Sequence, residues 1–313
     1  MKIITDLSTI KHPFTRPVVT IGNFDGVHKG HQALFHQVIE KAESIQGTSV
    51  AMSFEPHPLR VLKKKKFPPL ITLYEQKREL IEKTGIDVLI CIPFDKVFAA
   101  ITARQFVEDI LVKTIGLKAI VIGKDYSFGK DRQGNVAFLK QYAEEYEYEV
   151  IVTDWIQGSR RKADRISSTR IRETVINGQV EEVVALLGRY YQIRGKVVSG
   201  RNRGGRLLGF PTANIHLIDE LCPKAGVYAV TVECLGKKYQ GVANIGYSPT
   251  FDDHLFTVEV HLLDFKGDLY DQDIRVNFIA RIRDEKKFSG IDELSAQIAK
   301  DIQTGRDIFS RTR

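Results

Sequence analysis

Short apolar runs alternate with longer amphipathic stretches through the first half of the chain. The apolar runs have the length and β-branched content of strands, at residues 18–21, 49–54, 87–92, 119–122 and 149–153. The stretches between them carry apolar residues at helical spacing, at residues 30–44, 74–83, 102–115 and 136–146. This rhythm predicts a mostly parallel sheet with helices on both faces. Because such sheets bind ligands at the carboxyl ends of their strands, we expect the chemistry in the loops that follow those ends.

The pattern changes after Gly188. A helix expected over residues 167–187 is followed by strand-like runs separated by turn residues, at 191–198, 227–234, 238–244, 257–264 and 274–282. The next helix is expected at residues 292–302. This order predicts a small antiparallel β-barrel or sandwich closed by a C-terminal helix. We therefore expect two domains, an α/β domain at residues 1–187 and an all-β domain at residues 188–313.

The composition fits a folded protein of about two domains, with 43% hydrophobic and 27% charged residues in a chain of 313. Its apolar runs fall well short of the roughly 20 residues that span a bilayer. The first residues lack the apolar core of a signal peptide, which favours a cytoplasmic protein without a membrane partner. Three widely spaced cysteines predict neither a metal cluster nor a disulfide framework.

The formal net charge of +7 suits either a nucleic acid or a small polyanionic substrate. The one dense basic run, at residues 63–66, lacks the interleaved aromatic residues that a polynucleotide groove uses. We therefore expect small-molecule substrates and no nucleic acid. The sequence leaves the oligomeric state open, a homo-oligomer included.

The first candidate for chemistry is the turn GNFDGVHKGH at residues 22–31, between a predicted strand and a predicted helix. Its three glycines allow the backbone to bend and to approach a ligand closely. The free N–H groups at the start of the helix favour an anion. His28 and His31 are three residues apart, so both can donate hydrogen bonds to phosphate oxygens that gain charge. A pair of surface histidines or a chance pair of metal ligands is the alternative, and the three glycines with the strand–turn–helix context favour the phosphate clamp.

The second candidate is GRLLGFPTANI at residues 205–215. Thr212 and Asn214 lie on the same side of an extended segment, where they offer a hydroxyl and an amide oxygen. Such hard oxygen ligands suit a Mg²⁺ ion that bridges the phosphates of ATP. The basic loop that precedes them, from Gly200 to Arg206, could meet phosphates, although its composition alone favours a solvated turn.

The first turn resembles the HxGH signature of the nucleotidylyltransferase superfamily, and more specifically the FMN adenylyltransferase module of bacterial FAD synthetases. The segments SFEPHP (53–58), GKDYSFGK (123–130) and ISSTRIRE (166–173) agree with it. The resemblance implies a Rossmann-like domain in which His28 and His31 contact the phosphates of ATP and stabilise the transition state. It also implies nucleotide contacts from Gly22, Asn23, Asp25, Gly30, Ser168, Thr169 and Arg172, and a flavin side lined by Asp125 and Phe128.

The second segment is similar to the PTAN signature of riboflavin kinases, and the later strands match that family in order. The resemblance implies that Glu259 is a general base that takes the proton of the riboflavin 5′-hydroxyl. It implies nucleotide contacts from Gly200, Arg206, Thr212 and Asn214, the last two also holding Mg²⁺, and flavin contacts from Asn244, Arg281, Arg283 and Glu285. One departure is Asp271, which follows Leu269-Tyr270 where the family usually has glycine. It concerns the local turn and none of the implied ligands.

Together the two resemblances imply a bacterial bifunctional riboflavin kinase/FAD synthetase. The second domain would make FMN from riboflavin and ATP, and the first would make FAD from FMN and a second ATP, with Mg²⁺ serving both. One alternative is a monofunctional member with one silent module. Another is a flavin- or nucleotide-sensing regulator that binds RNA or a protein, which would have no need of a general base at Glu259.

Overall fold

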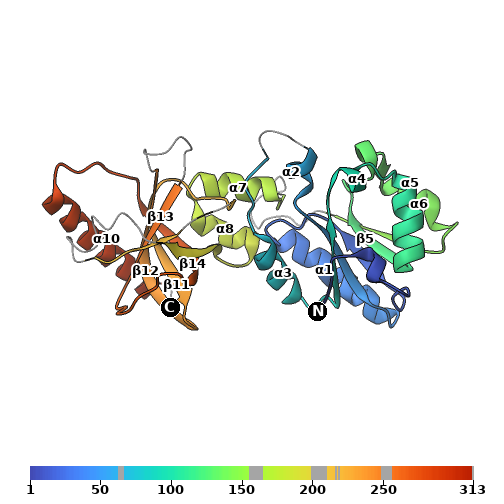
Figure 1. Ribbon diagram of the computed structural model, residues 1–313, viewed down its shortest axis with the longest axis horizontal. Coiled ribbons are helices and arrows are strands. Elements are labelled where there is room, and N and C mark those ends of the chain that lie inside the picture. Colours follow the sequence, from blue (N-terminus) through green and yellow to red (C-terminus); the bar gives the residue numbers. More distant parts are fainter. Residues whose placement is uncertain are drawn as a thin grey trace. The chain divides into compact units, whose positions relative to one another are not determined.

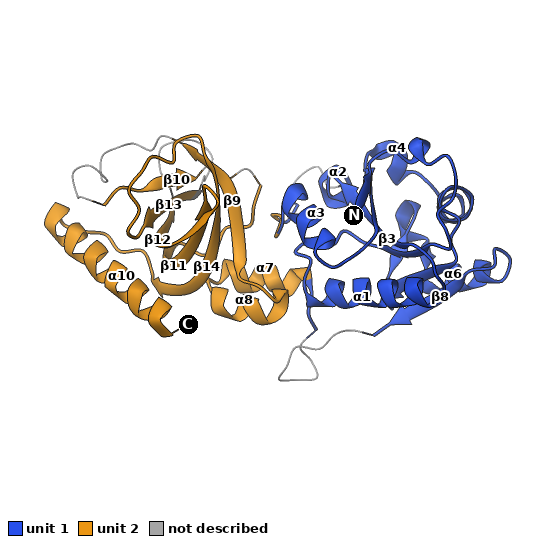
Figure 2. Cartoon of the chain, turned by 90° about the horizontal axis from the view of Figure 1, so that it is seen from below, with its two compact units in different colours: residues 1–68, 72–167 blue, residues 69–71, 168–313 orange. Residues whose placement is uncertain are grey.

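The computed structural model of the chain describes residues 1–62, 67–154, 165–198, 210–215, 217, 219–247 and 256–311. The chain divides into two compact units, coloured separately in Figure 2: residues 1–68 with 72–167, and residues 69–71 with 168–313. The boundary expected after residue 187 lies later than this division, because helices α7 (Ser168–Ile176) and α8 (Val180–Leu187) pack within the second unit. Where the functional boundary lies stays a prediction.

The first unit is built on one six-stranded sheet, in the order β1-β4-β3-β2-β5-β8. Strand β5 of this sheet and several helices of the unit are labelled in Figure 1. Every neighbouring pair of strands in it is parallel. The strands are β1 (Lys2–Ile4), β2 (Val18–Ile21), β3 (Ser49–Glu55), β4 (Val88–Pro93), β5 (Ala119–Gly123) and β8 (Glu149–Thr153). The sheet confirms the expected α/β fold, and β1 is an edge strand that the sequence pattern did not predict.

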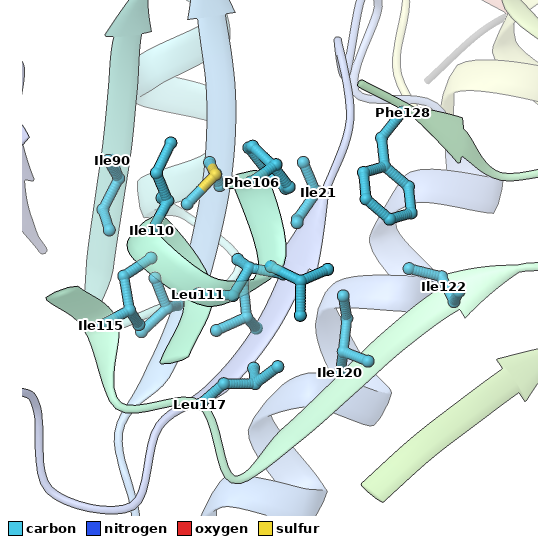
Figure 3. Packing of buried hydrophobic residues seen from close by; sticks show 14 of the residues in the cluster. Ile21, Ile90, Phe106, Ile110, Leu111, Ile115, Leu117, Ile120, Ile122 and Phe128 are labelled. Carbon is cyan, nitrogen blue, oxygen red and sulfur yellow. The ribbon is translucent and has the colours of Figure 1, made fainter. Parts of the chain in front are cut away.

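Helices cover both faces of this sheet. Val18 of β2 packs into the core under α1 (Lys29–Ser44) and α3 (Tyr74–Glu82). Ile21 of the same strand packs into the opposite core, under the helical segment Phe106–Ile115 (Figure 3). The smaller elements are α2 (Pro58–Leu62), α4 (Lys96–Ala99), α5 (Ala103–Gln105), α6 (Val136–Ala143), β6 (Ser127–Phe128), β7 (Gly134–Asn135) and the 3₁₀ turns Leu7–Thr9 and Lys130–Arg132.

The helix expected over residues 102–115 changes its winding along its length. It begins in a capping box, in which the N–H of Gln105 donates to the Thr102 hydroxyl at 3.2 Å and the Gln105 side chain accepts from the Thr102 N–H at 3.0 Å. From Phe106 to Ile115 the turns widen into a π-helix. The hydroxyl of Thr114 donates to the carbonyl of Asp109 at 2.7 Å, five residues earlier, in keeping with these wide turns.

The second unit is a closed antiparallel barrel in the order β10-β13-β12-β11-β14-β9, so the expected barrel or sandwich is a barrel. Its strands are β9 (Tyr191–Val198), β10 (Ala213–Ile215), β11 (Gly226–Cys234), β12 (Lys237–Tyr247), β13 (Phe256–Leu262) and β14 (Asp273–Arg283). Residues from five of these strands are fully buried in its core, among them Ile193, Val230, Ile245, Val258, Val260 and Phe278.

A long helix, α10 (Ile291–Arg311), packs against this barrel and extends past the expected end at residue 302. Its Phe309 belongs to a small apolar cluster with Ala229 and Ile279 of the barrel. An ion pair also joins the helix to β14, because Nη2 of Arg283 lies 2.7 Å from Oδ2 of Asp301, whose side chain is 5% exposed.

The turn that leads into β14 contains the unusual aspartate. Asp271 has a φ of 62°, in the left-handed region that favours glycine. Aspartate is among the residues that tolerate this region best. The N–H of Asp271 donates to the carbonyl of Val197 at 3.0 Å, and its carboxylate lies 3.1 Å from the ammonium of Lys196. The departure from glycine therefore leaves the turn in place.

Truncating the core of the first unit at Leu111, labelled in Figure 3, is expected to destabilise it strongly. Leu111 is 0% exposed, so Leu111→Ala leaves a cavity and should cost about 2–5 kcal/mol of unfolding free energy. Lys113→Ala on the same helical segment is the matched control, because its side chain is 69% exposed and its ion pair with Asp109 lies at the surface. Urea unfolding followed by circular dichroism measures both, and equal losses would contradict the described packing.

Candidate functional sites

Strand β2 lies where the strand order of the first sheet reverses, since its neighbours β3 and β5 flank it on opposite sides. Open parallel sheets bind ligands outside the carboxyl ends of their strands at such a point. Residues 22–28 leave β2 at its carboxyl end and lead directly into α1. The turn predicted to hold phosphates therefore lies where this architecture places ligands.

Hydrogen bonds from two neighbouring segments hold this turn. Asp25 is 4% exposed, and its Oδ1 accepts from the N–H of Thr72 at 3.0 Å and from its hydroxyl at 3.3 Å. The N–H of Gly26 donates to the same Thr72 hydroxyl at 3.0 Å, and the hydroxyl of Ser53 donates to the carbonyl of Asn23 at 3.3 Å. Asp25 therefore fixes the shape of the turn, and its partner Thr72 belongs to no motif that sequence reasoning singled out.

Two glycines of the turn lie in close contact with neighbouring rings. A Cβ added at Gly22 would lie 2.8 Å from the ring of Phe24, and one added at Gly30 would lie 3.1 Å from the ring of His28. These contacts give both glycines a structural reason. Their predicted contacts with the nucleotide stay predictions.

His28 and His31 lie together at the start of α1. Their rings are stacked with centroids 3.6 Å apart, and Nδ1 of His28 accepts the N–H of His31 at 3.3 Å. Because Nδ1 of His28 is an acceptor, a neutral His28 carries its proton on Nε2 and can donate from there. The structure thus brings the two predicted phosphate ligands into contact.

The surroundings of His31 favour its neutral form. Its Nδ1 is buried and has no hydrogen-bond partner among the residues that the structure describes. Burial, followed by the positive fields of His28 and Lys77, lowers the pKa of His31 well below its ordinary value of 6.5. At neutral pH this favours an uncharged His31 imidazole, and its contact with a phosphate stays a prediction.

The residues predicted for the flavin side of the first unit have structural partners. Asp125 lies 2.8 Å from the guanidinium of Arg165. Phe128 is 8% exposed and packs within 6 Å of the rings of Phe106, Tyr126 and Phe138. Phe128 thus belongs to the hydrophobic core, and the flavin contacts of both residues stay predictions.

Ser168, Thr169 and Arg172 belong to α7 and hence to the second unit. Ser168 is the first residue of that helix, and Thr169 is exposed. The Nε of Arg172 donates to the carbonyl of Pro69 at 2.9 Å within the same unit. Their nucleotide contacts stay predictions.

Three strands of the barrel bring predicted site residues into one row. Glu259 of β13 lies directly opposite Asn214 of β10 on one side and Asn244 of β12 on the other. Directly opposed residues of antiparallel strands project from the same face of the sheet. The neighbours of Glu259, Val258 and Val260, are fully buried, so this row projects away from the barrel interior.

Two further residues, Glu285 and His261, lie near this row. A Cβ added at Gly246 would lie 2.5 Å from Oε1 of Glu285 and 3.8 Å from Nδ2 of Asn244, so the Glu285 carboxylate lies beside β12 near the row. Nδ1 of His261 lies 2.9 Å from the carbonyl of Pro211, which ties the segment containing Thr212 to β13. His261 was given no role from the sequence, although its spacing of two from Glu259 placed it on the same face.

Glu259 is in a partly desolvated position. Burial raises the pKa of its carboxyl above the ordinary value of 4.5. A carboxylate with a raised pKa is a stronger base, which suits a group that accepts a proton. Thr212, by contrast, is exposed, and Asn214 is half-buried.

The two arginines predicted for the flavin have partners in the protein. Arg283 holds Asp301 through Nε at 2.9 Å and through Nη2 at 2.7 Å. Arg281 donates through Nη2 to the carbonyl of Ala225 and to Asp284, both at 2.8 Å. Their flavin contacts stay predictions, as do the nucleotide contacts of Gly200 and Arg206, which lie outside the described residues.

Comparison with known proteins assigns each half of the chain to a class. Residues 11–170 match the family model of FAD synthetase, and residues 187–309 match that of riboflavin kinase. The chain thus combines a nucleotidyltransferase domain with a flavin kinase domain. In the described part of the chain, none of the helices has the length and apolar character needed to cross a membrane.

Relatives match the chain over its whole length. It is 39% identical over 315 residues to the bifunctional riboflavin kinase/FMN adenylyltransferase of Escherichia coli strain K12. The match covers 100% of this chain and 99% of the relative. It is 37% identical to the protein of the same description from Listeria monocytogenes, with 96% of this chain and 98% of the relative covered. A crystal structure described as a macrolide-efflux protein from Streptococcus pneumoniae has a TM-score of 0.86 and 35% identity, with 97% of this chain and 98% of that one covered.

The chain belongs to the family of bifunctional riboflavin kinases/FMN adenylyltransferases. It phosphorylates riboflavin to FMN and adenylylates FMN to FAD, with ATP as the second substrate of both reactions. The predicted pair of activities is confirmed. The expected cytoplasmic location, the oligomeric state and the absence of nucleic-acid binding stay predictions.

The raised pKa of Glu259 predicts that this residue lowers the stability of the barrel at neutral pH. The folded pKa exceeds the unfolded one, so folding is favoured while the carboxyl is protonated, and this contribution is lost as the pH rises through the folded pKa. Glu259→Gln should therefore unfold at a higher temperature than wild type at pH 7, and the difference should shrink below pH 4.5. Thermal unfolding of both proteins at pH 7 and below pH 4.5 measures this difference in unfolding temperature. If the difference were the same at both pH values, the burial of Glu259 would be contradicted.

Proposed function

We propose that Glu259 is the general base of the kinase reaction, and that the row Asn214–Glu259–Asn244 is the floor of its site. The register that places these three side chains on one face is the observation that supports this assignment. Glu259 accepts the proton of the riboflavin 5′-hydroxyl, whose oxygen then attacks the γ-phosphorus of ATP. ADP leaves, and FMN is formed. Glu285, beside Asn244, holds the flavin from the same side.

Thr212 and Asn214 hold Mg²⁺ in this proposal. A hydroxyl and an amide oxygen are hard ligands of the kind that Mg²⁺ accepts alongside phosphate oxygens and water. Their neutrality fits a metal that arrives with ATP, because substrate phosphates then supply the negative charge. When bound, Mg²⁺ neutralises part of that phosphate charge. The contact between His261 and the carbonyl of Pro211 keeps these ligands at β13.

For adenylyl transfer, the proposal assigns the phosphate contacts to His28 and His31. A phosphate oxygen of FMN attacks the α-phosphorus of ATP, and pyrophosphate leaves. The imidazoles donate hydrogen bonds to the oxygens that gain charge as the α-phosphorus becomes five-coordinate. Asp25 and the glycines hold the turn in the shape that this requires.

The remaining assignments concern the partners, the location and the oligomeric state of the enzyme. Its partners are riboflavin, FMN and ATP, and we place it in the cytoplasm, where ATP is available. No nucleic acid is required by either reaction. A homo-oligomer is compatible with this scheme, in which each unit carries out its own reaction.

Two variants should separate the activities. Glu259→Gln should slow riboflavin phosphorylation by about 10²–10⁴-fold, because the base is lost, and leave the adenylylation of supplied FMN unchanged. The double variant His28→Ala/His31→Ala should slow adenylylation by at least about 10²-fold and accumulate FMN from riboflavin. Chromatographic separation of the flavins after incubation with ATP and Mg²⁺ measures both reactions in one sample.

Controls of the same residue types make this test specific. His36→Ala removes an exposed imidazole of α1, and Glu182→Gln neutralises an exposed carboxylate of α8, so both should retain both activities. If either site variant lost both activities while it remained folded, the assignment of the two sites would be wrong.

The metal assignment predicts a selective change in the Mg²⁺ requirement. Thr212→Val and Asn214→Ala each remove one oxygen ligand and should raise the Mg²⁺ concentration for half-maximal kinase activity about tenfold, equivalent to roughly 1.4 kcal/mol. The Mg²⁺ dependence of FMN adenylylation should stay at its wild-type value. Titrating both activities with Mg²⁺ at fixed ATP measures these concentrations. An equal increase in the Mg²⁺ requirement of both activities would refute the assignment.

A further inference from the structure

Phe24 is a buried aromatic residue of the histidine turn (residues 22–31), and neither reaction has yet given it a role. Its ring lies 4.8 Å from that of Phe35 of α1 and 5.3 Å from that of His31, measured between ring centroids. Gly22 leaves room for this ring, because a Cβ added there would lie 2.8 Å from Cε1 of Phe24. Phe24 therefore connects the hydrophobic core under α1 to one of the two predicted phosphate ligands.

Ring packing surrounds the His31 imidazole. Its Nδ1 is buried and accepts or donates no hydrogen bond within the described part of the chain. The ring of His28 stacks on it with an interplanar angle of 17°, whereas the ring of Phe24 meets it at 85°, within the range of edge-to-face contacts. One parallel and one perpendicular neighbour together limit the tilt of the imidazole. The direction in which Nε2 of His31 points therefore depends in part on Phe24.

The backbone of Phe24 has an uncommon conformation. Its φ is 49°, in the left-handed region, where a bulky residue is a genuine outlier and glycine meets no strain. The residues on both sides are held in place, since the carbonyl of Asn23 accepts the hydroxyl of Ser53 and the carboxylate of Asp25 accepts the N–H of Thr72. Such conformations persist where the surrounding structure enforces them, and they gather at functional sites. The bend of the turn alone does not require an aromatic ring here.

We propose that Phe24 is a positioning residue for adenylyl transfer, whose ring fixes the orientation of the His31 imidazole. This inference rests on the phosphate-contacting role proposed for His31. A hydrogen-bond donor stabilises developing charge best when it already points at the oxygen, because no reorientation is then needed during the reaction. A His31 ring that was free to tilt would lose part of that stabilisation. Phe24 acts on the reaction through His31 and contacts no reacting atom in this role.

The test uses variants of the full chain. Phe24→Met replaces the ring with a flexible apolar side chain, and Phe24→Leu replaces it with a smaller one. Val38→Ala is the control, because Val38 is 0% exposed in the same core and lies about two turns further along α1 than His31. His31→Ala is made alone and together with Phe24→Met. The kcat of FMN adenylylation and the KM for FMN and ATP are measured for each, with urea unfolding to show that the variants are folded.

Phe24→Met and Phe24→Leu should each lower kcat about tenfold, the size of one edge-to-face ring contact, and leave both KM values near those of wild type. This split is expected because the direction of the donor matters in the transition state more than in substrate binding. When His31 is already alanine, adding Phe24→Met should change kcat by less than about twofold, since the residue through which Phe24 acts is gone. Val38→Ala should lower the free energy of unfolding and keep the wild-type kcat.

A full tenfold loss from Phe24→Met in the His31→Ala chain would overturn the inference and leave the role of His31 standing, because Phe24 would then act independently of it. A wild-type kcat in Phe24→Met would also overturn it, since filling the space would be enough. An equal loss of kcat in Val38→Ala would do the same, because reduced stability would then be the cause. If His31→Ala itself left adenylylation unchanged, the role proposed for His31 would be refuted, and this inference with it.

Discussion

The antiparallel pairing of β13 with β10 and β12 is the constraint on which the proposed kinase site depends. Side chains alternate strictly between the two faces of a strand, so a slip of one residue would turn Glu259 into the barrel and expose Val258 or Val260. The burial of these two valines therefore fixes the register, and the register fixes the row of polar side chains. The site is specified by the hydrophobic core behind it.

The first site is held in a different way, because a turn has no ladder of its own. Its shape comes from single hydrogen bonds to neighbouring elements, above all from Asp25 to Thr72 and from Ser53 to Asn23. Each partner lies on or next to the carboxyl end of a parallel strand or the start of a helix. The sheet topology thus brings together residues of the turn and residues about 50 positions away that the motif itself does not contain.

The strongly periodic parts of the fold could be predicted from the sequence. Where the predicted bounds of an element are wrong, the cause lies in the local packing. Strands β2 and β8 have the predicted bounds, because short β-branched runs between turns leave little ambiguity. The C-terminal helix was expected to end at residue 302, whereas α10 continues to Arg311. Gly305 lies buried inside the added part of the helix, and a Cβ there would lie 3.2 Å from Val242, so the absence of a side chain permits close packing of helix and barrel. For the sites, motif residues could be named, whereas Thr72 could not, because only the folded chain brings it to the turn.

Desolvation shifts a pKa at both sites, and the direction of each shift depends on which form of the group is charged. Burial disfavours whichever form is charged, so it raises the pKa of the Glu259 carboxyl and lowers that of the His31 imidazole. The first shift gives the carboxylate more affinity for the proton that, in the proposed mechanism, it accepts from a hydroxyl. The second leaves an imidazole that donates a hydrogen bond without a fixed charge. In the proposed mechanisms one physical effect therefore serves proton abstraction in the barrel and charge stabilisation in the α/β unit, because the two proposed groups are of opposite charge type.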